Sequence, residues 1–398
     1  MRISTANGYS SAIESLMDRQ TKMSSTQEQM TTGKRVNVAS DDPAAAARAE
    51  RALAAQARTT ATQRAVDASN TAMTLGESAL GNAGDLLQSV RETMVQAGNA
   101  SLSDADRKSL AAQITQLRGQ LLVVANSTDG NGSYLFGGQG ANQPPFVNAA
   151  GGVQFRGTSG QTAVASGDGL PLTVDGQTSW MQAPTGNGVF ATSALTSTGS
   201  AWIDTGSVTN AAALTGATYE IQFSVAGGAT TYSVLQNGNP TAQTGVAFKS
   251  GQAIQIDGMS TTVSGQPANG DAFQLAPSTP TQTVFDVLDK TIADLNTSGR
   301  GNAQIAQSNS INLQSIDSVM GQLQAARSQA GAVLNRVDAD TSRLADNKLA
   351  SQTEVSNATD LDMTQAISDF SNQQTGYDAA LKAYSLVQGL SLFKYLSG

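Results

Sequence analysis

The sequence has no cysteine and no histidine, and aromatic residues make up only 5% of its 398 residues. Without cysteine there can be no disulfide, no thiolate metal ligand and no thiol nucleophile. Without histidine there is no histidine-based catalytic triad or histidine metal ligand. The shortage of aromatics leaves alanine and small polar residues to do much of the packing, which favours thin helical layers over a thick core. We therefore predict no cofactor and no metal.

Basic residues are also in short supply. The 23 Lys and Arg stand against 31 Asp and Glu, a net charge of -8, and this argues against a nucleic-acid partner, because phosphate binding needs a basic face. No apolar run approaches the roughly 18 residues of a membrane helix, so no membrane partner is predicted. Residues 1–15 lack the basic start and apolar stretch of a secretory signal. If the protein leaves the cell, we expect a route without a cleaved signal peptide.

Glycine and proline are rare at both ends of the chain. Of 39 Gly, 29 lie in residues 98–302, and eight of the nine Pro lie in residues 144–280. Because these residues punctuate turns and interrupt helices, the ends should be helical and the middle should contain strands and loops. The predicted fold class is α+β: a long antiparallel helical coiled-coil rod built from both termini, with an inserted all-β domain in the middle.

The predicted domains follow from this division. Residues 1–40 and 355–398 form terminal helices, residues 41–144 and 279–354 form a helical rod domain with a short β-hairpin, and residues 145–278 form the inserted β domain. The hairpin is expected at 133–138, after a turn at 129–132.

The first helical pattern has a seam that contains Gln and Met as well as Ile and Leu over residues 13–30, and Gly33 ends it. A new helix begins at Asp42 and Pro43, because Asp42 can cap free amides and Pro43 has no N–H to satisfy at the first helical position. The same cap explains Asp41 and Asp42 better than a metal or catalytic pair does. Lys34 follows Gly33 without the spacing of a P-loop, so no phosphate site is predicted.

Two apolar seams should hold the rod together. A third helix begins at Ser103, whose spacing to Asp106 approximates a capping box. Along this helix, apolar residues recur in steps of three and four. A heptad run with the same spacing lies in the C-terminal half of the chain. The predicted rod seam consists of Leu110, Ile114, Leu117, Leu121, Val333, Val337 and Leu344.

The C-terminal stretch regains an apolar face. Its members are Ile367, Phe370, Tyr377, Leu381, Leu392, Phe393 and Leu396. The lack of a basic face favours a subunit contact over a membrane surface. Because the terminal seams also contain Gln, Ser and Thr, an isolated pair of terminal helices should be marginal. We expect these helices to be disordered in the monomer and to fold against neighbouring subunits.

The middle of the chain has strand periodicity. Residues 219–225 alternate strictly, residues 253–263 contain a hairpin turn at Asp257-Gly258, and residues 272–275 suggest a closing strand. An enzyme housed there would use pairs of carboxylates. The candidates are Asp168, Asp175, Asp204, Glu220, Asp257 and Asp271. Most lie beside glycine, where turn chemistry accounts for them. An adhesive surface role for the β domain stays open beside a structural role.

Several motifs in order resemble those of a known family. They are Thr32-Gly33-Lys34-Arg35, Ser40-Asp41-Asp42-Pro43, residues 132–138, residues 334–338, and the tail segments 366–370, 377–381 and 391–396. Together they resemble bacterial flagellin-like axial proteins. Pro43 after the two Asp, where flagellins usually have Ala, is similar to the hook-associated protein 3 type. The resemblance covers roughly residues 1–140 and 281–398.

The resemblance implies a structural subunit and not an enzyme. Such proteins leave the cell through the flagellar type III apparatus with an export chaperone and form the junction between hook and filament, outside the cell. Their terminal helices line the central tube, and their partners are copies of themselves in a ring layer, a neighbouring hook-associated protein and flagellin, with no small-molecule substrate. The implied assembly and helix-cap motif is Gly33, Lys34, Arg35, Ser40, Asp41, Asp42 and Pro43. A flagellin-type filament subunit is the alternative.

Overall fold

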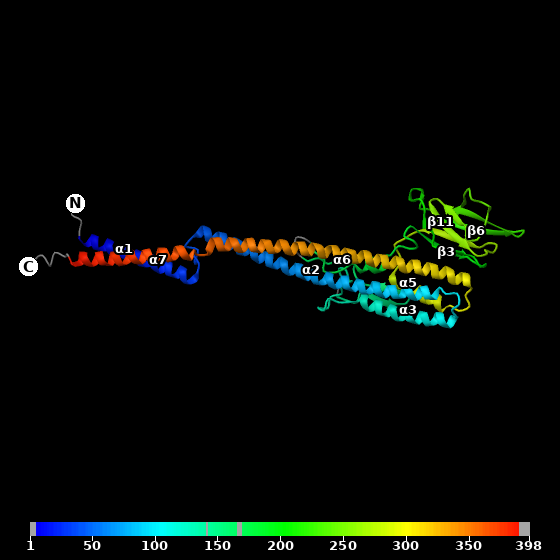
Figure 1. Ribbon diagram of the computed structural model, residues 1–398, viewed down its shortest axis with the longest axis horizontal. Coiled ribbons are helices and arrows are strands. Elements are labelled where there is room, and N and C mark those ends of the chain that lie inside the picture. The colour runs from blue at the N-terminus through cyan, green and yellow to red at the C-terminus, as the bar shows by residue number, and fades with distance from the viewer. Residues whose placement is uncertain (1–4, 141, 165–168, 390–398) are drawn as a thin grey trace, which may run out of the picture. The chain divides into compact units, whose positions relative to one another are not determined.

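A computed structural model describes residues 5–140, 142–164 and 169–389. The chain forms two compact units: unit 1 comprises residues 1–64 and 340–398, and unit 2 comprises residues 65–339. The helices come from both ends of the sequence and the strands from its middle (Figure 1). The predicted α+β fold class is therefore confirmed.

The described residues contain seven α-helices. They are α1 (Thr5–Thr32), α2 (Pro43–Ala97), α3 (Asp104–Ala125), α4 (Gly176–Met181), α5 (Val284–Asn296), α6 (Asn302–Thr359) and α7 (Met363–Gly389). The α2 helix is continuous through three glycines that would weaken an isolated helix. One of them lies at a close contact, since a Cβ at Gly76 would come within 3.1 Å of Val174. A Cβ at Gly81 would stand at an ordinary contact distance, 3.5 Å from Arg327. Gly76 therefore allows close packing inside unit 2.

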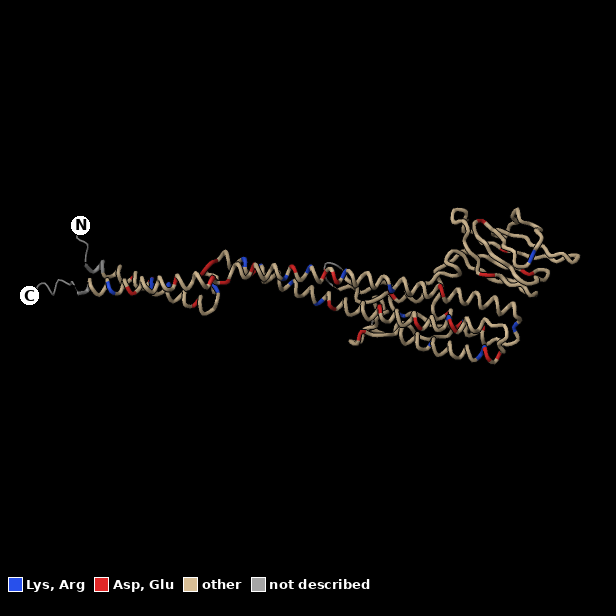
Figure 2. Tube along the Cα trace, viewed as in Figure 1, with Lys and Arg blue, Asp and Glu red and all other residues tan. Residues whose placement is uncertain are grey.

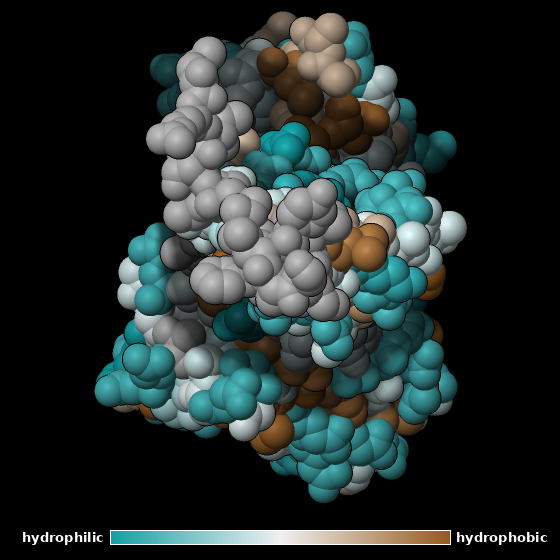
Figure 3. All heavy atoms as spheres, turned by 90° about the vertical axis from the view of Figure 1, so that its left-hand side faces the viewer, coloured by the Kyte–Doolittle hydropathy of each residue, from teal (hydrophilic) through white to brown (hydrophobic). Residues whose placement is uncertain are grey.

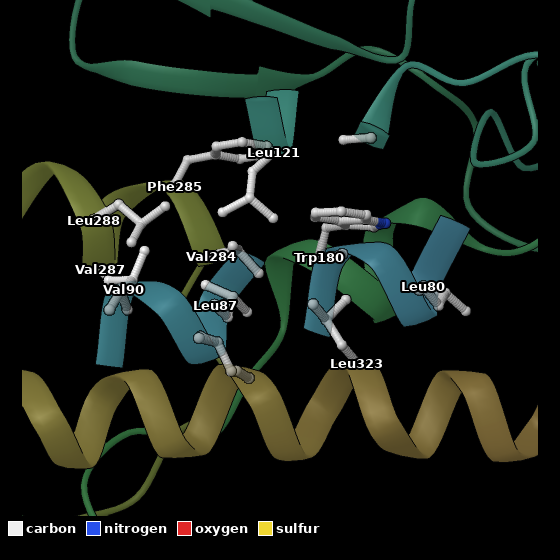
Figure 4. Packing of buried hydrophobic residues seen from close by; sticks show 14 of the residues in the cluster. Leu80, Leu87, Val90, Leu121, Trp180, Val284, Phe285, Val287, Leu288 and Leu323 are labelled. Carbon is white, nitrogen blue, oxygen red and sulfur yellow. The ribbon is translucent and has the colours of Figure 1, made fainter. Parts of the chain in front are cut away.

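Unit 2 has a helical core to which α2, α3, α5 and α6 contribute. Ile114 and Leu121 of α3 are fully buried, and α3 packs along α5. The Trp180 and Phe285 rings stack at 6.0 Å between centroids, in the middle of the cluster that Figure 4 shows. The capping box predicted at Ser103 is confirmed.

The segment before the β domain also belongs to this helical core. The two-stranded sheet of β1 (Phe146–Ala149) and β2 (Gly152–Phe155), together with α4, places Phe146 and Trp180 in the helical cluster. The predicted domain boundary at residue 145 stays a prediction, but the change of core lies some 40 residues later, between Ala183 and Phe190.

The short hairpin predicted at 133–138 differs in the structure. Tyr134 makes only an isolated bridge with Thr128, and Gly137 and Gly138 bridge to residues far along the chain. The reason is that neighbouring Leu135 and Phe136 are buried in the helical core. Packing of these two side chains directs the segment away from a local strand pair.

A second core lies between two antiparallel sheets. One sheet has the order β3-β12-β6-β7-β8, with β9 on β7, and the other has the order β10-β11-β4, with β5 on β11. The strands are β3 (Phe190–Thr196), β4 (Trp202–Ile203), β5 (Ser207–Val208), β6 (Tyr219–Ala226), β7 (Ala229–Gln236), β8 (Asn239–Pro240), β9 (Val246–Ala247), β10 (Ala253–Ile256), β11 (Met259–Ser264) and β12 (Ala272–Pro277). We call residues 190–277 the β sandwich. The strands predicted at 219–225, 253–256, 261–263 and 272–275 are confirmed.

Candidate assembly interface

The predicted helix-cap motif lies at a break between helices in unit 1. The α1 helix ends at Thr32, and Gly33 follows with φ +70°, the left-handed conformation that ends many helices. The Gly33 carbonyl accepts a hydrogen bond from the Leu361 N–H at 3.0 Å, and the Arg35 N–H donates to the Thr359 carbonyl at 2.7 Å. The break after α1 is thus joined to a second break between α6 and α7.

Arg35 connects three parts of this region. Its guanidinium lies 3.0 Å from the Asp42 carboxylate and also donates to the Ala358 carbonyl at 2.9 Å. Ala358 is in the last turn of α6, where carbonyls lack intrahelical partners and a cation is favourable. Val36 beside it is buried, whereas Lys34 and Ser40 are exposed.

The two aspartates of the motif accept different backbone bonds. Asp42 Oδ1 accepts from the Ala44 and Ala45 N–H groups at 3.1 and 2.9 Å, in the first turn of α2 after Pro43. The hydrogen bond from the Ala45 amide, followed by that from Arg35, lowers the Asp42 pKa below its ordinary value. Asp41 Oδ2 accepts from the N–H groups of Asn37 and Val38 instead. One aspartate starts the helix and the other holds the loop before it.

The sequence predicted a terminal helix separate from the rod, over residues 355–398, but not the cap that starts it. Asp362 Oδ1 accepts from the Thr364 and Gln365 N–H groups at 3.0 and 3.1 Å, so it caps α7 as Asp42 caps α2. No proline marks this start, and polar residues before it hide the end of α6. The signal that could have revealed it is Asp362 itself, a capping residue type placed two and three positions before the free amides of Thr364 and Gln365.

Helices α1 and α7 pack against each other with a thin core. Half-buried or buried residues of α7 recur in steps of four and three and include Phe370 and Tyr377, and Tyr384 meets Tyr9 edge to face at 6.2 Å between ring centroids. One contact between the helices is polar, since the Thr26 hydroxyl donates to Gln373 Oε1 at 3.0 Å. Such a polar seam gives little hydrophobic stabilisation.

The structure divides the predicted C-terminal assembly face into two groups. Phe370 and Tyr377 lie in the half-buried stripe of α7. Ile367 and Leu381 stand beside that stripe, two heptads apart, and are 53% and 40% exposed. Leu392, Phe393 and Leu396 lie outside the described residues. An exposed apolar flank therefore accompanies the contact between α1 and α7.

Helix α1 has exposed apolar side chains too. Ile13 is 39% and Met17 62% exposed. Figure 3 shows hydrophobic and hydrophilic residues interleaved on the side of the molecule that faces the viewer. Charged residues of both signs are spread along the described helices (Figure 2).

The predicted rod-seam residues are placed in the two units. Ile114, Leu121 and Val337 are fully buried in unit 2, where Leu110, Leu117 and Val333 are half-buried and pack on the helical core. Leu344 is 5% exposed and belongs to unit 1. These positions lie in α3 and α6, the helices for which the seam was predicted.

The described carboxylates of the middle segment accept hydrogen bonds from the structure around them. Asp204 Oδ1 accepts from the Gly206 and Thr262 N–H groups, and Asp271 accepts from three N–H groups and a hydroxyl. Asp257 accepts from Tyr219, Glu220 from Gln222, and Asp175 caps α4. Asp168 lies outside the described residues. Five of the six candidates thus have structural roles.

Two further findings concern the described residues alone. None of their helices combines the length and apolarity that crossing a membrane requires. They also contain no group of three or more acidic side chains placed to hold a metal ion.

Comparison with known proteins gives consistent matches. The bacterial flagellin N-terminal helical region matches residues 3–141, and the C-terminal helical region matches residues 313–396. Flagellar hook-associated protein 3 of Escherichia coli K12 is 29% identical over 394 residues, 99% of both chains. That of Salmonella typhimurium LT2 is 42% identical over 160 residues, which cover 38% of this chain and 48% of the relative. The flagellar junction protein FlgL of Legionella pneumophila has a similar structure, with 32% identity, a TM-score of 0.65, and coverage of 70% of this chain and 94% of that one.

Proposed function

The chain belongs to the flagellar hook-associated protein 3 family, and we propose that it is the structural subunit that forms the junction between hook and filament in its own bacterium. Family membership rests on the N- and C-terminal flagellin regions and on similarity to FlgL over almost the whole solved chain. The work of such a subunit is mechanical, and its sites are helix surfaces.

The observation that supports assembly most directly is the exposed apolar flank of α1 and α7. Met17, Ile367 and Leu381 are between 40% and 62% exposed although they accompany the seam of a helix pair. Apolar side chains grouped on a helix favour a covering partner over water. Neighbouring copies in a ring layer, and the hook-associated protein and flagellin above and below it, would provide that cover.

The route to this location is also part of the proposal. The subunit would leave the cell through the flagellar export apparatus, accompanied by a chaperone, and would act outside the cell. The proposed role is structural, and Asp204, Asp271 and Asp257 accept hydrogen bonds within the β sandwich.

Deletion of the gene tests the junction role. We expect cells with intact hooks that lack filaments, release flagellin into the medium and do not swim. Restoring the gene should return filaments. A deletion strain that keeps hook-borne filaments would contradict the junction role, and filaments made of a second flagellin alone would favour a filament subunit instead.

We further propose that α1 and α7 are ordered only when neighbours cover them. Their pairing buries few apolar side chains, so the free energy gained is small against the chain entropy lost. In free monomer, amides of residues 9–30 and 363–386 should exchange with deuterium within seconds, whereas those of α3 and α5 stay protected. Light scattering would establish that the sample is monomeric. Slow exchange of both groups of terminal amides in that sample would refute the proposal.

A further inference from the structure

The helical core and the β sandwich share no buried side chain. The helical cluster contains Ala183 and resumes at Val284, whereas the sandwich cluster begins at Phe190 and ends at Leu275. Between these residues the chain passes twice between the helical core and the β sandwich. We call residues 183–189 and 278–282 the neck.

The neck is a narrow ribbon held by backbone bonds. Ala183 and Gln282 exchange two hydrogen bonds at 2.9 and 3.0 Å, the Thr185 N–H donates to the Thr279 carbonyl at 3.0 Å, and the Ser278 N–H donates to the Val189 carbonyl at 2.9 Å. A two-stranded ribbon on its own is marginally stable and twists easily. The neck alone therefore gives weak control of how the sandwich is seated.

One face of α6 supplies polar contacts to this region. Gln307, Gln314, Ser318 and Gln322 follow one another at steps of seven, four and four, which places them on one side of the helix. Gln314 Nε2 donates to the Gly186 carbonyl at 3.3 Å, the Ser318 hydroxyl to the Pro184 carbonyl at 2.5 Å, and Gln322 Nε2 to the Thr178 carbonyl at 2.8 Å. The buried Ile316, Val319 and Leu323 lie on another side, in the helical core.

Gln307 is the member of this row that reaches the sandwich. Its Oε1 accepts a hydrogen bond from the Ile203 N–H of β4 at 2.6 Å. Among the described residues this is the one hydrogen bond between residues 190–277 and a helix. Ile203 is fully buried, and Gln307 Nε2 is buried without a partner. The side-chain amide of Gln307 is therefore removed from water, at a cost in free energy, and makes a single hydrogen bond in return.

We propose that Gln307 is a latch that fixes the seating of the β sandwich on α6. With the Gln307–Ile203 bond closed, the sandwich is held at the neck and at a second point, β4, and cannot turn about the neck. Without the bond, the sandwich is attached through the two-stranded neck alone, whose Pro184 and Gly186 carbonyls remain bonded to α6, and it pivots as a folded body.

The test compares Gln307→Met with Gln322→Met in the full chain. Both substitutions replace an amide on the same face of α6 by an apolar side chain of similar length, but Gln322 bonds to Thr178, on the helical-core side of the neck. Because the chain has no cysteine, spin labels at Asn239→Cys and Ser328→Cys report one distance, between the sandwich and α6. We expect a broad distance distribution in Gln307→Met, a narrow one in Gln322→Met and in the unsubstituted chain, and about five- to tenfold faster exchange of the Ile203 amide in Gln307→Met alone.

A second measurement separates release from unfolding. In Gln307→Met the amides of β6 and β12 should keep the protection they have in the unsubstituted chain, because the sandwich core is untouched. Equal distance distributions in the two Met variants would overturn the latch. So would loss of β6 and β12 protection in Gln307→Met, since the residue would then support the sandwich fold and not its seating.

Discussion

Asp271→Asn is expected to unfold the β sandwich while the helical core of unit 2 stays folded. Asp271 is fully buried, and its two carboxylate oxygens accept four hydrogen bonds. The donors are the Thr198 N–H at 2.7 Å, the Thr198 hydroxyl at 2.9 Å, the Gly199 N–H at 3.1 Å and the Ala268 N–H at 2.8 Å. The carboxylate therefore ties the turn after β3 to the turn before β12.

The amide of Asn cannot replace this carboxylate. Its oxygen can keep the two bonds from Thr198, but its NH2 group would face the N–H groups of Gly199 and Ala268, so donors would meet donors in a buried site. Losing two charge-assisted bonds and leaving donors unsatisfied should cost about 3 to 5 kcal/mol. Because the two cores share no residue, α3 and α5 should be spared.

Hydrogen exchange followed by mass spectrometry distinguishes the two cores. Amides of β6 and β12 should lose protection in Asp271→Asn, and amides of α3 and α5 should not. Asp257→Asn is the matched control, since the exposed Asp257 accepts one bond from Tyr219 and should have a much smaller effect. Equal protection of the strands in the two variants would show that Asp271 does not hold the sandwich.

The same carboxylate should make the sandwich sensitive to acid. Burial raises the Asp271 pKa, but the bonds from Thr198, Ala268 and Gly199 outweigh burial and hold the pKa below its ordinary 3.8. A depressed pKa in the folded state gives stability that is complete above the ordinary value and disappears as the pH falls through the folded value. The unsubstituted sandwich should therefore lose stability below about pH 3.8, and Asp271→Asn should lack that part of the slope.

Local sequence signals were sufficient to predict the helix break after α1. The backbone of Gly33 is left-handed, the side chain of Asp42 caps α2, and Pro43 lacks an N–H. Each effect acts within a few residues, so the local sequence is enough to predict it. The strict alternation at residues 219–225 likewise predicted β6, because one face of that strand is buried.

Long-range packing decided what the sequence did not reveal. Leu135 and Phe136 form no regular strand because they fill the helical core, and Phe146 and Trp180 join that core from a segment with strand-like composition. The break between α5 and α6 at residues 297–301 lies within the segment 279–354 that was predicted as part of the helical rod. Ile203, the partner of Gln307, and Ala358, one partner of Arg35, are distant in sequence, and no local periodicity reports such pairs.

Ile367→Asp combined with Leu381→Asp should abolish assembly without destabilising the monomer. Both side chains are exposed on the flank of α7, so replacing them in the free subunit removes little buried area and should change the free energy of unfolding by no more than about 0.5 kcal/mol. In the assembled layer the same positions are proposed to be covered. A carboxylate there would have to leave water without a partner, at a cost of several kcal/mol.

The comparison variant is Asn372→Asp, which adds a carboxylate at an exposed position on the opposite side of α7 from Leu381. Strains with each variant should secrete equal amounts of subunit. Swimming and filaments should be lost for the Ile367 and Leu381 double variant and kept for Asn372→Asp, and purified double variant should fail to add to isolated hooks in electron micrographs. Normal filaments in the double variant would mean that this flank of α7 stays in water in the junction, and the covering surface would then have to lie elsewhere on the terminal helices, at Ile13 and Met17 of α1.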